Sequence, residues 1–219
     1  MKKLYTINTV NNFMDIIFKP FVKPYCDAHD IEVYNIMDDS LLKSTIADHG
    51  MKAPTANRMI NYALAAQAAG ADGILVTCTS VNQATRDIKP FLSIPIINIE
   101  EPVAEMAVAN GKKIGVLATL PTSPVAIDRV IREKAAAAGK EVEIIDRVAE
   151  GAFDILCAGD RAKHDQMVCE CLYDLAKEVD VIVFAQISMS LLKFDADKVG
   201  KPIYMIGESG LARIDSLMK

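Results

Sequence analysis

The sequence predicts an α/β protein of two similar lobes, each a mainly parallel sheet flanked by helices. Three observations lead to this fold class: short β-rich runs alternate with longer helical patterns, several strands are apolar throughout, and the second half repeats the first. The runs at residues 74–76 and 181–184 contain only apolar side chains, as strands do when helices cover both faces of a sheet. Such alternation is typical of βαβ units.

The strands expected in chain order lie at residues 4–8, 31–36, 73–77, 94–98, 113–118, 141–145, 181–185 and 202–205. The clearest helical patterns between them lie at residues 54–69, 103–109, 125–138 and 165–177. Pro121 and Pro124 suit the first turn of a helix, where a backbone N–H has no partner to lose. Three glycines suit helix ends: Gly70, Gly111 and Gly139.

The two halves of the chain repeat each other in sequence. Residues 72–80 align with residues 180–188 at an offset of 108, which places Cys78 opposite Gln186. Three more matches follow in the same order, at offsets of 111, 107 and 110: residues 31–33 with 142–144, 94–96 with 201–203, and 7–9 with 117–119. Any two βαβ runs look somewhat alike, and that alternative stays open, but four ordered matches favour a duplication. We expect a first lobe at 1–100, completed by 206–219, and a second lobe at 101–205.

Composition narrows the class of protein. The 219 residues carry a net charge of −5 without a dense Lys/Arg run, so the electrostatic footprint of a nucleic-acid binder is missing. Neither an apolar segment of membrane-spanning length nor a signal-peptide pattern appears, and we therefore expect a cytoplasmic protein. The cysteine count is odd, which disfavours a disulfide framework, and neither the C-x-C pair Cys169 and Cys171 nor the scattered histidines (His29, His49 and His164, expected in exposed turns) form a metal site. Cys26, Cys157 and the C-x-C pair are interpreted as buried or half-buried thiols.

A duplicated fold predicts a cleft between the lobes. Ligands of open α/β sheets bind at the carboxyl ends of the strands. Five polar side chains follow predicted strands and would converge there: Asn8, Thr9, Cys78, Thr119 and Gln186.

Cys78 is the candidate catalytic group. It ends a buried strand and precedes a helical pattern running toward Ile88. Backbone N–H groups at a helix start lower a thiol's pKa and favour the thiolate. The same groups, with the hydroxyls of Thr79 and Ser80, could hold a carboxylate or an enolate oxygen. Cysteine is also common in protein cores, but a strand-end position among polar residues favours function.

Two further turns remain open to more than one interpretation. Thr119, Thr122 and Ser123 suit an anion site at a helix start, and an ordinary N-cap would explain the same residue types. Asn8 and Thr9 share that ambiguity. Asp38 follows the second strand, and a helix cap before Leu41 is the preferred interpretation over a position at the cleft edge.

The chain resembles the Asp/Glu/hydantoin racemase superfamily. The resemblance covers essentially the whole chain and rests on Val-Thr-Cys-Thr-Ser at 76–80 and on Lys-Ile-Gly-Val-Leu-Ala-Thr at 113–119. It implies a cofactor-independent enzyme in which two cysteines, one per lobe, remove and return a proton without metal or pyridoxal phosphate. Cys78 corresponds to the first, whereas Gln186 stands in place of the second. Glutamine has no titratable proton, so two-base racemisation cannot run in its usual form.

The resemblance leaves several functions open. A racemase or isomerase acting on a small carboxylic or amino acid is preferred, with Gln186 orienting or stabilising the substrate. Relatives with one essential cysteine include arylmalonate-type decarboxylases and maleate-type isomerases. A non-catalytic carboxylate-binding protein is the alternative from another class, and a cysteine hydrolase lacks an obvious histidine base. We also expect a homo-oligomer, a dimer or higher.

Overall fold

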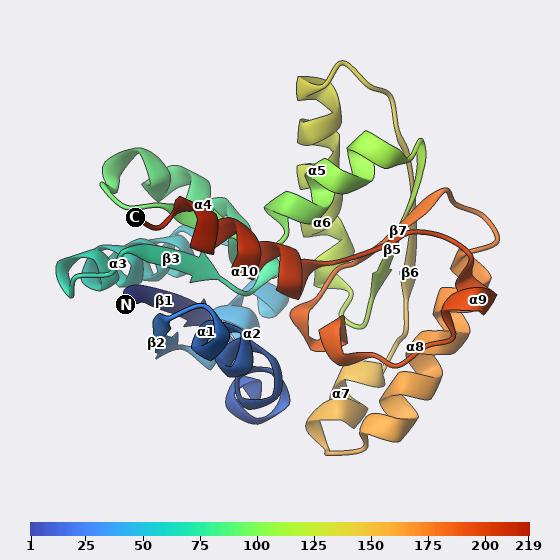
Figure 1. Cartoon of the computed structure of the whole chain (residues 1–219), viewed down its shortest axis with the longest axis horizontal. Helices are drawn as coiled ribbons and strands as arrows, with labels where there is room; N and C mark the ends of the chain where they lie inside the picture. Colours follow the sequence, from blue (N-terminus) through green and yellow to red (C-terminus); the bar gives the residue numbers. More distant parts are fainter. The chain divides into compact units, whose positions relative to one another are not determined.

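The computed structural model describes residues 1–219 and contains two four-stranded parallel sheets (Figure 1). Residue contacts divide the chain into two compact units, one of Met1–Ile99 with Gly207–Lys219 and the other of Glu100–Ile206. The strand order is β2-β1-β3-β4 in the first unit and β6-β5-β7-β8 in the second, and all paired strands are parallel. The predicted α/β fold of two similar lobes is therefore confirmed.

The strands of the first sheet are β1 (Lys2–Asn8), β2 (Ile31–Met37), β3 (Gly73–Val76) and β4 (Ile96–Asn98). Those of the second are β5 (Lys113–Ala118), β6 (Glu143–Val148), β7 (Val181–Phe184) and β8 (Ile203–Met205). β3 and β7 are buried at every residue, because helices cover both faces of each sheet. β6 starts two residues later than the sequence predicts, since Glu143 pairs with Lys113 and β5 offers no partner before that residue.

The strand register reproduces the sequence repeat. Leu4 pairs with Gly73 in the first sheet, and Ile114 pairs with Val181 in the second. These partners lie 110 and 108 residues apart along the chain, the offsets found in the sequence. The edge strands pair at registers that match the offsets of 111 and 107 as well. General βαβ topology would not reproduce each register, so the sequence match reflects a structural repeat.

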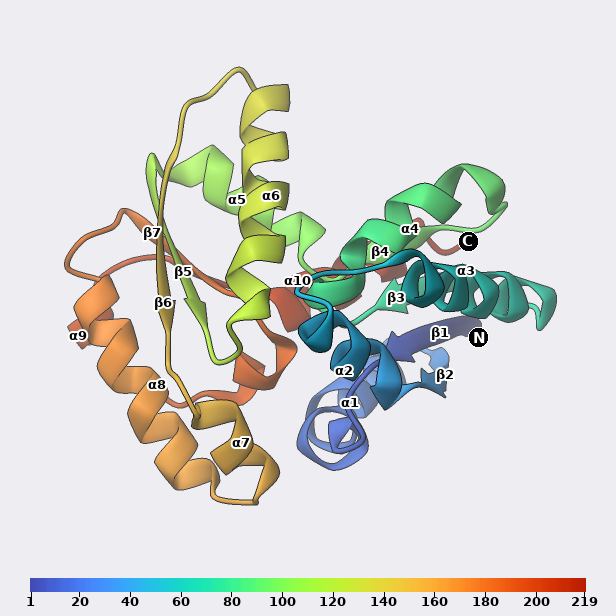
Figure 2. The same cartoon turned by 180° about the vertical axis from the view of Figure 1, so that it is seen from behind.

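The helical segments of the first unit are η1 (Met14–Val22), α1 (Lys23–Ala28), α2 (Asp39–Ala47), α3 (Ala53–Ala68), η2 (Thr79–Val81), α4 (Asn82–Ile88), η3 (Lys89–Phe91) and α10 (Ile206–Leu217). α2, α3 and α4 pack on one face of the sheet, where Met59 and Ile88 join Ile74 in a buried cluster. α1 and α10 cover the other face (Figures 1 and 2), and Lys2 Nζ binds Asp215 Oδ1 of α10 at 2.9 Å. The C-terminal helix thus completes the first unit.

η1 is an element that the sequence does not announce. It is a π-helix with Pro20 inside it, directly after β1. Proline has no N–H to donate to a regular α-helical ladder, and the wider π turn accommodates this loss.

The helical segments of the second unit are α5 (Glu101–Asn110), α6 (Thr122–Ala137), α7 (Ala152–Cys157), α8 (Arg161–Leu175), η4 (Ile187–Leu191) and α9 (Ala196–Val199). Leu172 and Leu175 of α8 pack with Ile182 and Phe184 of β7 in the core of one face. α5 and α6 contact each other and cover the opposite face. Gly111 caps α5, and the other predicted helix-end glycines directly follow the caps of α3 and α6.

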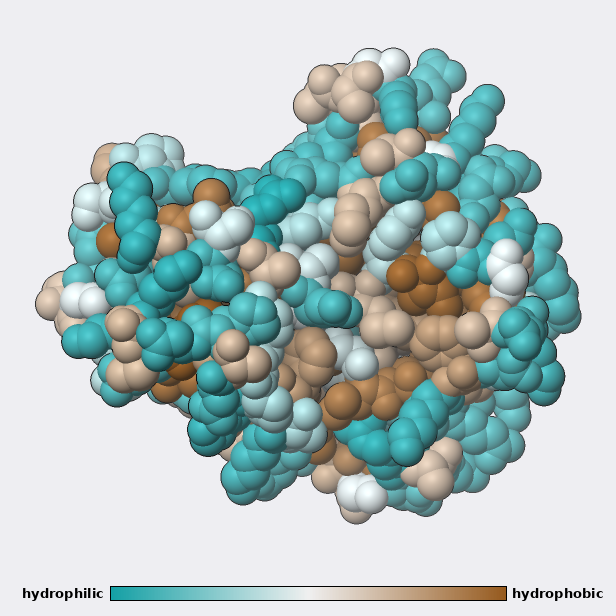
Figure 3. Space-filling model, viewed as in Figure 1, coloured by the Kyte–Doolittle hydropathy of each residue, from teal (hydrophilic) through white to brown (hydrophobic).

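Hydrophilic residues occupy most of the visible rim of the second unit, with hydrophobic residues in patches between them (Figure 3). No helix has both the length and the hydropathy needed to cross a membrane.

Candidate active site

The carboxyl edge of the first sheet, where its parallel strands end, brings Asn8 and Cys78 to the same side. Ile7 pairs with Val76, so the residues that follow β1 and β3 emerge together. The Asn8 side chain is fully buried. Its Nδ2 donates to Thr6 Oγ1 at 2.9 Å, and its Oδ1 accepts from Thr77 Oγ1 at 2.7 Å. Hydrogen bonds at both ends of the amide fix Asn8 in one orientation.

Thr9 continues this edge. The side chain is 3% exposed, and its Oγ1 is buried without a hydrogen-bond partner. Buried hydroxyls in folded proteins are nearly always paired, because an unmade bond costs the desolvation of the group. A hydroxyl left in this state at the end of a strand is available to a bound molecule.

Cys78 lies two residues beyond the end of β3. Its backbone is extended (φ −117°, ψ 112°), and it is the N-cap residue of η2. The thiol is half-buried and packs against the core cluster that contains Met59 and Val81. Thr79 is buried and Ser80 is half-buried. The helix that the sequence predicts after Cys78 is present, but it opens with a single 3-10 turn before the seven-residue α4.

Asp38 anchors a polar network at the end of β2. Its Oδ1 accepts from the Ser40 N–H at 3.0 Å, so the predicted helix cap is confirmed. Its Oδ2 accepts from Arg58 Nη1 at 3.0 Å and from the Tyr62 hydroxyl at 2.9 Å. Burial alone would raise the pKa of Asp38, but the hydrogen bonds from Ser40 and Tyr62 and the Arg58 charge hold that pKa below its ordinary value.

Arg58 is a residue that sequence reasoning missed. Its side chain is 36% exposed, so the guanidinium reaches solvent while Asp38 holds one of its nitrogens. α2 packs against η2, and Tyr62 and Cys78 pack on the same core cluster. The Arg58 network therefore borders the Cys78 turn. Nothing in the surrounding Ala-rich helix marks this position, because its partner lies 20 residues earlier in the chain.

In the second unit, Gln186 binds the turn between β5 and α6. Its Oε1 accepts from the Thr119 N–H, from the Thr119 hydroxyl at 3.0 Å and from the Leu120 N–H at 3.3 Å. Gln186 is 8% exposed and Thr119 is 2% exposed. Backbone N–H groups can only donate, so this network identifies the oxygen end of the amide. The Nε2 end, with its two N–H donors, is turned away from the turn.

This arrangement decides between the two interpretations of the Thr119 turn. The N-cap residue of α6 is Pro121, and no side chain caps this helix. The Thr119 hydroxyl and N–H instead hold an oxygen atom, as an anion site would. Thr122 is the first residue of α6.

Two serines after Gln186 also escaped prediction. Ser188 and Ser190 lie in η4, and their Oγ atoms are buried without hydrogen-bond partners. The duplication offset of 108 pairs Ser188 with Ser80, and that signal could have identified it.

The expectation that His164 lies in an exposed turn is wrong. His164 is completely buried in α8, which begins four residues before the predicted helix, and its Nδ1 lies 2.7 Å from Asp165 Oδ1. His29 and His49 are exposed, as expected.

Comparison with known proteins agrees with this fold. The sequence matches the Asp/Glu/Hydantoin racemase family over residues 21–212, and the chain belongs to this family. Solved structures with the same fold include aspartate racemase from Picrophilus torridus (TM-score 0.73, 14% identity, covering 99% of this chain and 94% of that one). Allantoin racemase from Klebsiella pneumoniae (0.68, 14%, 99% and 87%) and glutamate racemase from Bacillus anthracis (0.67, 15%, 99% and 81%) are similar too. No curated protein sequence matches the chain. The chain is thus an enzyme of the racemase (isomerase) type.

Proposed function

We propose that this protein is a cofactor-independent enzyme that acts on a small carboxylic or amino acid through a single catalytic thiolate, Cys78. The observation that carries the proposal is the state of Gln186. It stands at the position equivalent to Cys78, it has no proton to exchange, and its oxygen is occupied by Thr119 and Leu120. One-sided chemistry fits such a pair better than the two-sided transfer of a racemase with two thiols.

In the proposed reaction the Cys78 thiolate removes the proton on the α-carbon. The C–H bond breaks, the proton passes to Sγ, and the electron pair enters the substrate as an enolate. The Gln186 N–H donors are suited to stabilise the negative charge on an enolate or carboxylate oxygen. Return of a proton from Sγ to the same face completes exchange without inversion.

A second candidate reaction follows from the same single thiol. In a decarboxylation of the arylmalonate type, the bond to a carboxylate breaks, carbon dioxide leaves, and the Cys78 thiol protonates the enediolate on one face. A maleate-type isomerisation, in which the thiolate adds to carbon, is also compatible with one cysteine.

Substrate contacts are proposed for hydroxyl groups near these two residues. Thr79, Ser80 and the unpaired Thr9 hydroxyl would bind substrate beside Cys78, where buried Asn8 supports the edge. Thr122 would contribute in the second unit. Thr119 would act through Gln186, because its donors are already used.

Arg58 would supply positive charge for a substrate carboxylate. Its guanidinium is partly exposed and is held by the Asp38 carboxylate, which also fixes its direction. A cytoplasmic location and a homo-oligomeric state stay predictions.

The test follows deuterium incorporation at the α-carbon by NMR in heavy water, with a panel of small amino, monocarboxylic and dicarboxylic acids. Wild-type protein should exchange at least one of them, and Cys78→Ala should not. Cys171→Ala is the matched control, because Cys171 is a half-buried thiol of α8 and should leave exchange intact.

Three results would count against the proposal. Exchange retained by Cys78→Ala would remove the thiol from the mechanism. Racemised product from wild-type protein would reveal a second acid and end the single-thiol reading. Binding of a carboxylate without exchange or turnover would favour a binding protein. Gln186→Cys adds a constructive arm, since a second thiol should introduce inversion of the exchanged substrate.

A further inference from the structure

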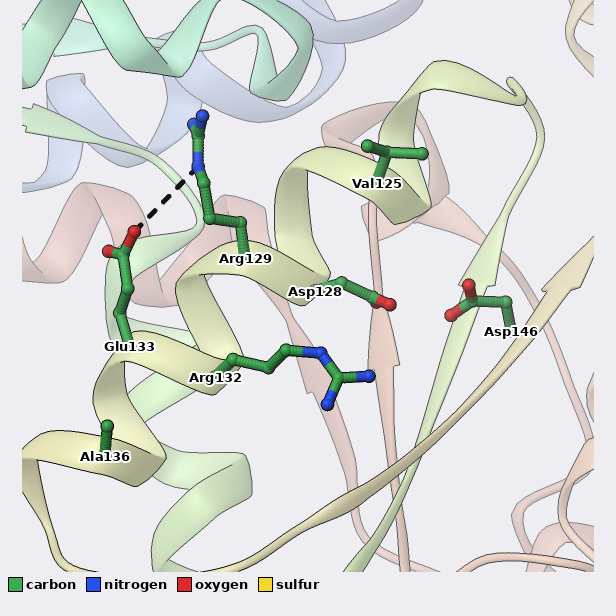
Figure 4. A pocket seen from close by; sticks show the side chains of 7 residues that line it. All are labelled: Val125, Asp128, Arg129, Arg132, Glu133, Ala136 and Asp146. Atoms are coloured by element: carbon green, nitrogen blue, oxygen red, sulfur yellow. Dashed lines mark ion pairs between the residues drawn. The ribbon is translucent and has the colours of Figure 1, made fainter.

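A groove lies between α6 and the edge strand β6 of the second unit. It has a volume of about 560 Å³ and is lined mainly by residues of α6, with Asp146 contributed by β6 (Figure 4). The carboxyl groups of Asp128 and Asp146 point toward each other across the groove. The mechanism above uses neither of them.

The two carboxyl groups cannot both be ionised at low cost. Like charges in contact repel, and such a pair holds one proton between its members. Asp128 Oδ1 is buried without a hydrogen-bond partner, although Asp146 itself lies on the exposed edge strand. Burial, followed by the Asp146 charge and hydrogen bond, raises the pKa of Asp128 to about 7. Burial also raises the pKa of Asp146.

The surrounding charges do not neutralise the pair. Arg132 of α6 lowers the pKa of both carboxyl groups, but the raising effects outweigh it. The remaining charged residues at the groove and on the elements beside it have partners of their own. These ion pairs are Arg129 with Glu133 at 4.0 Å on α6, Lys134 of α6 with Glu105 of α5 at 2.7 Å, Arg147 of β6 with Glu178 at 2.6 Å, and Lys113 of β5 with Glu143 of β6 at 3.6 Å.

We propose that Asp128 and Asp146 share one proton that fastens α6 to β6, and that its loss toward alkaline pH loosens α6. α6 begins at Thr122, directly after the turn whose N–H groups hold Gln186. The shared proton therefore stabilises the helix that follows this turn. The proposal does not depend on which reaction the enzyme catalyses.

The sign of the pH dependence follows from the direction of the pKa change. A carboxyl group whose pKa is raised in the folded chain contributes stability that is complete below its unfolded pKa, here 3.8. That contribution declines as the pH rises and is lost above the folded value of about 7. Second-unit stability should therefore fall between these two values.

The direct test is a carboxyl-carbon NMR titration of the full chain labelled at aspartate. Wild type should show one aspartate resonance with an apparent pKa well above those of the others, near 7. Asp128→Asn should abolish that transition, and Asp146→Asn should return Asp128 to its ordinary range. Asp154→Asn, on the exposed face of α7, should leave the transition unchanged.

Hydrogen exchange supplies the structural readout. After correction for intrinsic rates, wild-type α6 should exchange roughly tenfold faster at about pH 8 than at about pH 5, whereas Asp128→Asn should show no such difference. Titration of every aspartate below about pH 5, or an equal pH effect on α6 in both Asn variants and wild type, would overturn the proposal. Should Asp128→Asn fail to fold, Asp146→Asn alone decides between these outcomes.

Discussion

Gln186→Met tests whether the Gln186 oxygen holds the turn between β5 and α6. Methionine is unbranched and similar in size, so the side-chain volume is kept while the acceptor is lost. Three donors lose their partner: the Thr119 N–H, the Thr119 hydroxyl and the Leu120 N–H. The hydroxyl can rotate to another acceptor, whereas the two N–H groups cannot.

The expected loss of stability can be estimated donor by donor. An unpaired buried donor costs about 1–3 kcal/mol. Thr119 is 2% exposed and should contribute most of that cost, whereas the Leu120 bond is longer, at 3.3 Å, and should contribute less. We therefore expect a decrease of about 2 kcal/mol in the free energy of unfolding. For a chain of this length that corresponds to a Tm lower by about 4–8 °C.

Urea denaturation and thermal melting measure this change. Gln186→Glu is the matched control, because a carboxylate keeps the acceptor and should stay within about 1 kcal/mol of wild type. Gln166→Met makes the same substitution at an exposed position of α8 and should change stability by less than about 0.5 kcal/mol. A Gln186→Met variant as stable as the Gln166→Met control would refute the reasoning.

Three further predictions concern the first unit. Gly210→Ala should lower stability by about 1–3 kcal/mol in urea denaturation, because its Cβ would lie 2.4 Å from Ile99 Cγ1 and 2.9 Å from the Ile99 carbonyl oxygen; an unchanged midpoint would contradict this close approach. The pKa of Asp38 is lowered in the fold, so its contribution is present above the unfolded pKa and is lost as pH falls through the folded one. Asp38→Asn should therefore be less stable near neutrality and show a flatter acid limb, and equal slopes for both proteins would rule this out. Arg58→Gln should raise KM for a carboxylate substrate roughly tenfold with a smaller change in kcat, and an unchanged KM would remove Arg58 from substrate binding.

The sequence predicted the fold because the duplication leaves a mark on each strand. Apolar runs such as 181–184 need helices on both faces, and the four offsets correspond to strand pairs that the structure reproduces. The Asp38 cap was predictable as well, since capping is settled within a few residues of the chain. These features depend on local periodicity and on neighbours close in sequence.

Contacts between distant residues were decided only by the tertiary structure. The sequence places Gln186 opposite Cys78, but it does not reveal that the amide oxygen is held by Thr119, 67 residues away. Arg58, the facing pair Asp128 and Asp146, and buried His164 are further examples. A side chain's partners depend on which strands and helices become neighbours, and a carboxyl group titrates according to what burial and nearby charge surround it.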